Sequence, residues 1–145
     1  MTRRTALQSL AATAMLPLVA DALGQTSDVT PDTVYELRVY HLHEGKLPLI
    51  LDRFRSKETA IFKRLGMHPV AYWTPTMEDT NAEPAGQTLI YIVRHRSRDA
   101  ARDAWAKFKV DPEWVALKTE TEKDGPFNIK NDSIFMQLTD FSPKI

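Results

Sequence analysis

The alternation of apolar and polar residues along the chain predicts four β-strands. In residues 34–42, VYELRVYHL, apolar side chains occupy alternate positions and β-branched and aromatic residues are frequent, which is typical of a strand. Residues 68–75, HPVAYWTP, alternate in the same way, and their two prolines mark strand ends or an edge. The apolar run 88–96, TLIYIVRHR, predicts a central strand, and residues 133–141, SIFMQLTDF, predict the fourth.

Apolar residues spaced three and four positions apart predict helices between these strands. Such spacing over residues 47–65 predicts a first helix, which Gly66 ends. Its charged residues are expected to form a solvated face: Arg53, Arg55, Lys57, Glu58, Lys63 and Arg64. Ser97 is a typical N-cap for a second helix. The apolar face of that helix contains Ala101, Ala104, Trp105 and Phe108. Asp111, followed by a proline, begins a further helical segment that extends to about residue 123.

The resulting order, β-α-β-β-α-β, contains two split crossover units and predicts an α+β, ferredoxin-like domain over residues 34–142. One sheet face must pack against the helices, and we expect it to carry Val39, Tyr72 and Tyr91. The opposite face then carries further bulky residues: Tyr40, Trp73 and Ile92. An exposed apolar sheet face usually marks an interface. We therefore expect a homodimer in which two sheets stack face to face, which is a dimeric α+β barrel.

Composition narrows the possible partners. The 145 residues include 19 basic and 19 acidic ones, so the net charge is zero. This balance gives no long-range attraction to nucleic acid or to anionic membranes. The chain contains no cysteine, which excludes disulfides, thiolate metal sites and cysteine nucleophiles.

The first 22 residues are predicted to be a bacterial signal peptide. Arg3 and Arg4 precede a mildly apolar run, and a small-x-small pattern, Ala-Asp-Ala, ends at Ala22. The pair of arginines resembles a twin-arginine export signal, although Ala6 stands where a bulky apolar residue is usual. The run is too short to span a membrane stably, so we expect a periplasmic or extracellular protein with no membrane insertion after cleavage. The alternative is an N-terminus retained in the cytoplasm. Residues 23–33 are polar and predict a linker.

Several stretches of the chain resemble the NIPSNAP family. They are YELRVYHLHEGKLPLIL, HPVAYWTP, TLIYIVRHRSRDAARDAWAKF and the DPEW that follows, and together they span about residues 34–141. The resemblance implies the fold of the dimeric α+β barrel proteins, which agrees with the element order. It implies no established catalytic residues.

The first candidate site lies on the predicted dimer cleft. Glu36, Arg38 and Tyr40 share one face of the first strand, and a carboxylate, a guanidinium and a phenol in one cleft can hold a small acid or act on a proton beside a carbonyl. The alternative is a salt bridge with a tyrosine rim at the dimer interface. Trp73 and Arg94 are further candidates for ligand contact. Trp105 and Trp114 could also line an aromatic ligand pocket. We interpret Trp105 instead as a core residue, because it follows the helical pattern, and Trp114 as a helix-corner residue after the Asp-Pro cap.

His41 and His43 have the most metal-like spacing, because residues two apart in a strand share a face. Their position at a strand end favours two solvent-exposed histidines instead, and we expect neither a metal nor a cofactor. A haem-binding alternative would need His95 or His41 in the cleft.

Two functions follow from these observations. The first is a small-molecule-binding or interaction protein without catalysis. The second is a cofactor-independent monooxygenase or isomerase that acts on a small organic molecule in the cleft. The second rests on the fold, which does not imply function.

Overall fold

The computed structural model describes residues 29–76 and 84–145 of the chain. The predicted signal peptide and most of the predicted linker lie outside the described residues. The elements follow one another as β1 (Val34–Leu42), α1 (Leu47–Arg53), η1 (Phe54–Glu58), α2 (Thr59–Arg64), β2 (His68–Trp73), η2 (Ala85–Gln87), β3 (Thr88–His95), α3 (Arg98–Val110), α4 (Pro112–Thr121) and β4 (Asn128–Met136). This order confirms the predicted ferredoxin-like α+β domain.

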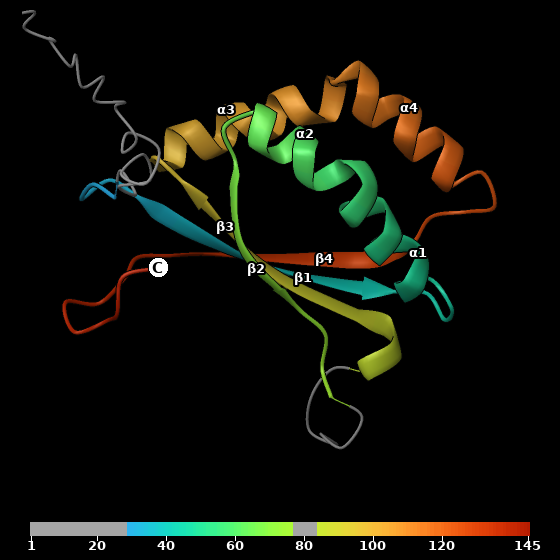
Figure 1. Cartoon of the computed structure of the whole chain (residues 1–145), viewed down its shortest axis with the longest axis horizontal. Helices are drawn as coiled ribbons and strands as arrows, with labels where there is room; N and C mark the ends of the chain where they lie inside the picture. The colour runs from blue at the N-terminus through green and yellow to red at the C-terminus, as the bar shows by residue number, and fades with distance from the viewer. Residues whose placement is uncertain (1–28, 77–83) are drawn as a thin grey trace, which may run out of the picture.

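The four strands form one antiparallel sheet in the order β2-β3-β1-β4 (Figure 1). β1 lies at its centre, where Arg38 is opposite Tyr91 of β3 and Ser133 of β4. Each crossover therefore returns the chain to a strand that does not neighbour the one before it, as in other ferredoxin-like folds. Two strands of the described chain, β2 and β4, form the sheet edges.

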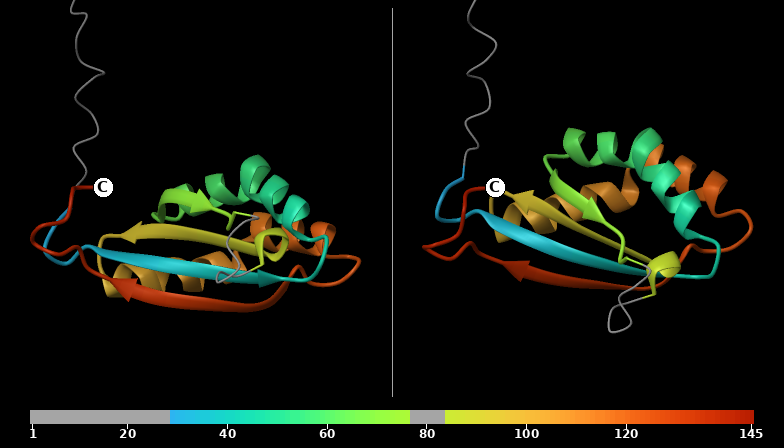
Figure 2. Two further views of the ribbon diagram at one scale, coloured as in Figure 1. Left: turned by 90° about the horizontal axis from the view of Figure 1, so that it is seen from below. Right: turned by 60° about the horizontal axis from the view of Figure 1, so that its bottom comes forward.

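The helices α1 to α4 of the described residues pack on one face of the sheet (Figure 2). The Ser97 side chain accepts a hydrogen bond from Ala100 N, and Asp111 accepts bonds from Glu113 N and Trp114 N, so both predicted N-caps are confirmed. Gly66 follows α2 with a φ of 82°, a left-handed conformation that glycine adopts without steric cost. Among the described residues, no helix is long and apolar enough to cross a membrane.

The fourth strand begins and ends five residues earlier than the sequence pattern predicts. The prediction of residues 133–141 followed the apolar run, whereas β4 spans Asn128–Met136 and begins with a polar stretch. β4 pairs only with β1 and most of its side chains are exposed. An edge strand of this kind is held by backbone hydrogen bonds and needs little apolar patterning.

The expectation for which face of β1 packs on the helices is wrong. Tyr40 and Leu42 belong to the hydrophobic core, while Val39 lies on the other face. Glu36 and Arg38 therefore also point toward the helices. Apolar residues usually occupy this face because unpaired charges are costly to bury. Here the cost is offset because the two charges pair with each other and with further polar partners.

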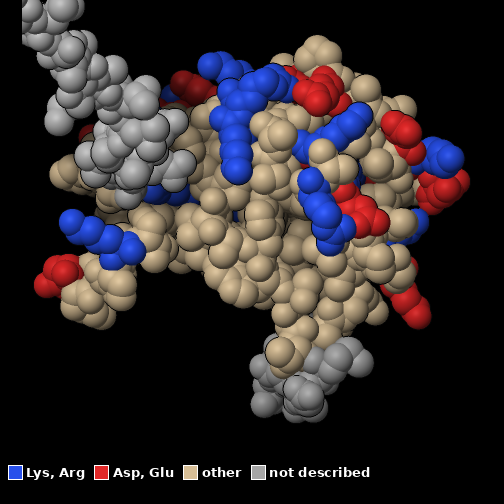
Figure 3. Space-filling model, viewed as in Figure 1, with Lys and Arg blue, Asp and Glu red and all other residues tan. Residues whose placement is uncertain are grey.

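The sheet face opposite the helices is largely apolar and open. Leu37 and Ile134 are register partners on this face, and Ile134 is 55% exposed. Trp73, at the β2 edge, is 46% exposed. Near one end of the sheet the C-terminal segment covers Tyr35, whose hydroxyl donates to the Ile145 carbonyl at 3.1 Å. Figure 3 shows that charged side chains lie mainly over the helical layer, whereas the region around β2 is largely free of them.

Candidate functional site

Glu36 is the centre of a buried polar cluster between β1 and α3. Its side chain accepts hydrogen bonds from Arg38 Nη1 at 2.7 Å, Trp105 Nε1 at 2.6 Å and Ser133 Oγ at 2.7 Å. Its Oε2 atom also lies 3.0 Å from His95 Nε2. Burial would raise the pKa of this carboxyl, but the hydrogen bonds from its four partners outweigh burial and lower the pKa to about 2. Glu36 is therefore held as a carboxylate.

Arg38 connects this cluster to the aromatic core. Its guanidinium carbon lies 4.4 Å from the ring centroid of Trp105 and 5.4 Å from that of Tyr40. Burial would lower the pKa of Arg38, but the oxygens of Tyr91, Tyr40 and Glu36 raise it above its usual range. The arginine is a permanent cation in an aromatic environment.

Tyr40 and Tyr91 form a buried phenol pair beside Arg38. The Tyr91 hydroxyl donates to the Tyr40 hydroxyl at 2.6 Å. Burial raises the pKa of both phenols, and the effect is greater for Tyr91, where proximity to Tyr40 adds to it. Both groups are therefore neutral hydrogen-bond donors at physiological pH.

Arg53 is the centre of a second buried cluster. It donates from Nε to Glu58 Oε2 at 2.8 Å and from Nη1 to Glu122 Oε1 at 2.7 Å. Its guanidinium carbon also lies 4.9 Å from the ring centroid of Trp114 and 4.8 Å from that of Phe127. Burial raises the pKa of Glu58 to about 7, since the adjacent Arg53 offsets only part of the desolvation.

The π-helical segment η1 explains this second cluster. Arg53 immediately precedes η1 and Glu58 ends it, so the two are five positions apart. In an α-helix residues with this separation point in different directions, whereas the wider π turn brings them to one side. Both residues are buried, so the prediction that they belong to a solvated helix face is wrong for these two.

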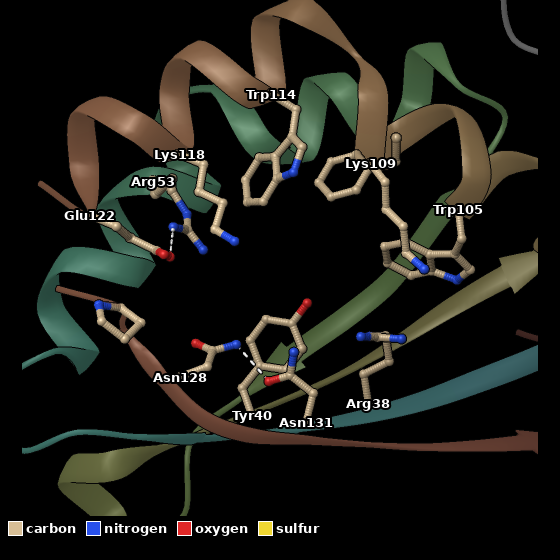
Figure 4. Close-up of a pocket in the computed structure, with 12 residues that line it drawn as sticks. Arg38, Tyr40, Arg53, Trp105, Lys109, Trp114, Lys118, Glu122, Asn128 and Asn131 are labelled. Atoms are coloured by element: carbon tan, nitrogen blue, oxygen red, sulfur yellow. Dashed lines mark hydrogen bonds and ion pairs between the residues drawn. The ribbon is translucent and has the colours of Figure 1, made fainter.

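A pocket of about 320 Å³ lies between the sheet and helices α3 and α4, between the two clusters (Figure 4). Its aromatic lining consists of Tyr40, Trp105, Phe108 and Trp114. Its basic lining consists of Arg38, Arg53, Lys109 and Lys118. Glu122, Pro126, Asn128 and Asn131 complete it. Figure 4 shows Trp114 on the helical side, across the pocket from Tyr40 and Asn131 of the sheet.

Two buried side-chain atoms of the lining residues have no hydrogen-bond partner within the described part of the chain. They are Arg38 Nε and Asn128 Oδ1, although the Asn128 amide nitrogen donates to Asn131 Oδ1 at 2.6 Å. Buried polar atoms are nearly always hydrogen-bonded in folded proteins. Both atoms have less than 1 Å² of accessible surface, so they are covered by protein atoms and are not exposed to the pocket.

The residues predicted from the sequence do not form one site. Glu36, Arg38 and Tyr40 lie together, but between sheet and helices rather than between two sheets, and only Arg38 and Tyr40 line the pocket. Trp73 and Arg94 lie on the opposite sheet face, where Trp73 is the register partner of Ile90 and Arg94 that of Tyr35.

The candidate metal-binding histidines are separated from the pocket. His41 Nε2 lies 2.7 Å from Asp132 Oδ2 on the open sheet face, and His43 is exposed in the following turn. His95, the other histidine considered for haem, is enclosed by Glu36 and Phe135 and does not line the pocket. Within the described ranges, no cluster of three or more histidine, aspartate or glutamate side chains could hold a metal ion.

Sequence reasoning missed most of the pocket. Trp114 was interpreted as a helix-corner residue, and it does stack on Phe108 with ring centroids 4.4 Å apart, but it also forms a pocket wall. Lys109 and Lys118 carry no sequence signal, because a lysine on a helix is usually solvated. The helix restart at Asp111 was the available signal, since it turns α4 so that Trp114 and Lys118 face β1.

Three similar solved structures are bacterial proteins. An uncharacterised NIPSNAP-like domain protein from Burkholderia xenovorans superimposes with a TM-score of 0.65 at 14% identity, over 79% of this chain and 91% of that one. A NIPSNAP family protein from Agrobacterium tumefaciens gives 0.63 at 20% identity, over 77% and 97%. SnoaB, a cofactor-independent oxygenase from Streptomyces nogalater, gives 0.51 at 15% identity, over 78% and 99%. No curated protein matches the chain.

These similarities establish the fold as that of the dimeric α+β barrel proteins and agree with the element order derived from the sequence. At such low identity they carry no information on activity. The model of the NIPSNAP family matches residues 35–143, which include every described helix and strand except the first residue of β1. The chain is therefore a member of the NIPSNAP family.

Proposed function

We propose that this chain is a small-molecule-binding protein whose ligand occupies the pocket between the sheet and helices α3 and α4. The observation that carries the proposal is a pocket of about 320 Å³ that combines aromatic walls with basic side chains. Tyr40, Trp105 and Trp114 belong to the walls, and Lys109 and Lys118 to the basic lining. Small-molecule sites typically have this size and combine apolar walls with a few convergent polar groups.

The proposal is tested with a variant whose larger side chain fills the pocket. Asn131 is exposed on the edge strand and lines the pocket, so Asn131→Trp should occupy the space without removing a core contact. The wild-type protein, screened by thermal shift against organic acids, phenols and amides, should be stabilised by a subset of them, and Asn131→Trp should abolish that shift. Lys123→Trp, an exposed change outside the pocket, is the control. Stabilisation that survives in Asn131→Trp would place the ligand elsewhere and contradict the proposal.

The proposal includes a homodimer. The open sheet face carries Leu37, Ile134 and Trp73, which a second copy would cover. This arrangement keeps the pocket inside each subunit, away from the interface. A dimer would therefore have two independent pockets.

The second candidate function is a cofactor-independent monooxygenase or isomerase. The observation that favours it is the neutral Tyr40 phenol beside the Arg38 cation in the pocket lining. These two groups can stabilise the oxyanion of an enolate, which is the species that either reaction requires. Deuterium exchange at the enolisable carbon of phenylpyruvate, followed by NMR, tests this function. The enzyme should accelerate exchange and Tyr40→Phe should abolish the acceleration, whereas exchange at the buffer rate would leave only the binding role.

Export to the periplasm is the remaining part of the proposal. It rests on the Arg3-Arg4 pair, the apolar run and the Ala-Asp-Ala pattern ending at Ala22. N-terminal sequencing of the protein from a bacterial periplasmic fraction should give a start at residue 23. Recovery of the intact N-terminus in the cytoplasmic fraction would contradict export.

A further inference from the structure

We propose that the ligand of this pocket is a small planar aromatic carboxylate, held by the aromatic walls and by the ammonium groups of Lys109 and Lys118. This inference rests on the proposed function and specifies the ligand class. It follows from the shape of the aromatic lining and from the way charge is distributed around it.

The aromatic walls favour a flat, unsaturated ligand. Trp114 of α4 and Tyr40 of β1 face each other across the pocket, and Trp105 bounds the end where Arg38 lies (Figure 4). The Trp114 ring is fixed by stacking on Phe108 and by the Arg53 guanidinium. Rigid aromatic rings lose little conformational entropy when they contact a planar ligand. Aromatic–aromatic contacts add a further favourable interaction energy.

The two arginines of the lining already form ion pairs. Arg38 is paired with Glu36, and Arg53 with Glu58 and Glu122, all at hydrogen-bond distances. They position the walls, and their charges are largely balanced before any ligand enters. The net positive charge of the pocket must therefore come from other residues.

Lys109 and Lys118 supply that charge. Neither forms an ion pair with any side chain in the described part of the protein, and they enter from either side of Trp114, one from α3 and one from α4 (Figure 4). An ammonium group beside an aromatic wall in a partly enclosed space binds a carboxylate more strongly than one in bulk water. Two such groups in one pocket lining favour an anion over a neutral molecule of the same shape.

A structural role at the helix ends would also explain basic residues here. Lys109 lies in the last turn of α3 and Lys118 in the last turn of α4, where positive charge interacts favourably with the helix dipole. Lys107 lies in the same last turn of α3 but does not line the pocket. Replacing Lys107 therefore distinguishes a helix-dipole role from a ligand-binding role, because it should affect the helix and leave ligand binding intact.

The test compares three probes by isothermal titration calorimetry. 2-Naphthoate is planar and anionic, 2-naphthamide is planar and neutral, and cyclohexanecarboxylate is anionic without an aromatic ring. We expect 2-naphthoate to bind at least about tenfold more tightly than either of the others. 2-Naphthamide lacks the charge-assisted hydrogen bond, and cyclohexanecarboxylate lacks the ring contacts. Higher ionic strength should reduce this preference for 2-naphthoate over the amide.

Variants of the lysines complete the test. Lys109→Gln and Lys118→Gln should each weaken 2-naphthoate binding about fivefold and leave 2-naphthamide binding unchanged. Lys107→Gln should change neither. Equal binding of 2-naphthoate and 2-naphthamide, with both abolished by Asn131→Trp, would overturn the carboxylate inference while the pocket remained the binding site. If none of the three probes binds, the inference is overturned. The proposed function fails as well only if no compound of the wider thermal-shift screen stabilises wild type in a way that Asn131→Trp abolishes.

Discussion

Arg53 Nε donates a 2.8 Å hydrogen bond to Glu58 Oε2, and both side chains are buried. Burial raises the pKa of Glu58 from 4.5 to about 7, so the folded protein binds a proton at Glu58 more tightly than the unfolded chain does. A raised carboxyl pKa means that folding stability falls as the pH rises from about 4.5 to about 7 and is constant above that range. One pKa unit corresponds to about 1.4 kcal/mol, so the total loss is at most roughly 3 kcal/mol.

Glu58→Gln should remove this pH dependence. The amide oxygen can still accept from Arg53, but it carries no charge to desolvate. The free energy of unfolding of the variant, minus that of wild type, should be about 1–3 kcal/mol larger at pH 8 than at pH 5. Urea unfolding at both pH values measures this difference. Glu120→Gln, an exposed change on α4, should show no such gain. A wild-type protein that becomes more stable relative to Glu58→Gln as the pH rises would contradict the raised pKa.

Glu36 should show the opposite pH dependence. Its pKa is lowered from 4.5 to about 2, so its contribution to stability is complete above about pH 4.5 and is lost as the pH falls toward 2. Glu36→Gln should cost about 3–5 kcal/mol at neutral pH, because it leaves the Arg38 charge buried without its partner.

A double-mutant cycle separates this charge effect from simple loss of packing. Arg38→Met alone should also destabilise the protein, but Glu36→Gln combined with Arg38→Met should cost less than the sum of the single changes. Chemical denaturation of the four proteins at neutral pH gives the coupling energy. Additive losses would mean that the two charges do not stabilise each other.

Asp111 should contribute more to stability than its ion pair alone suggests. It caps α4 by accepting from Glu113 N and Trp114 N, and it also accepts from Arg64 Nη1 and Nη2 at 3.0 Å each. Arg64 is about half exposed, so solvent screens the ion pair. Asp111→Ala should therefore lower the thermal midpoint at least about twice as much as Arg64→Ala. Equal losses would mean that the cap contributes little.

The sequence pattern was sufficient for the order of elements and for the caps at Ser97 and Asp111, because these depend on local periodicity and side-chain chemistry. It failed where tertiary partners change the local preference. Glu36 packs against the helices only because Trp105, His95 and Ser133 hydrogen-bond to it there. Arg38 does so because it pairs with Glu36. The alternating pattern of residues 34–42 does not indicate those partners.

The pocket was hidden for a related reason. Its walls come from β1, α1, α3, α4, the loop after α4 and the start of β4. Only Arg38 and Tyr40 among its residues were predicted ligand contacts. The π turn that buries Arg53 beside Glu58 has no sequence signature that would distinguish it from a regular helix. Lys109 and Lys118 acquire their significance only from their position beside Trp114.

The open sheet face leads to the last prediction. Ile134 of β4 is 55% exposed and is the register partner of Leu37. If a second copy covers this face, Ile134→Glu would bury unpaired carboxylates in the interface, which costs several kcal/mol. We expect wild type to be a dimer by size-exclusion chromatography with light scattering, and Ile134→Glu to be a folded monomer. Val115→Glu, at a 48% exposed position on α4, should remain dimeric. A monomeric wild type, or a dimer that tolerates Ile134→Glu, would show that this face has another role.

Because the pocket lies within one subunit, the Ile134→Glu monomer should still bind its ligand, and loss of binding on dissociation would show that the partner contributes to the site.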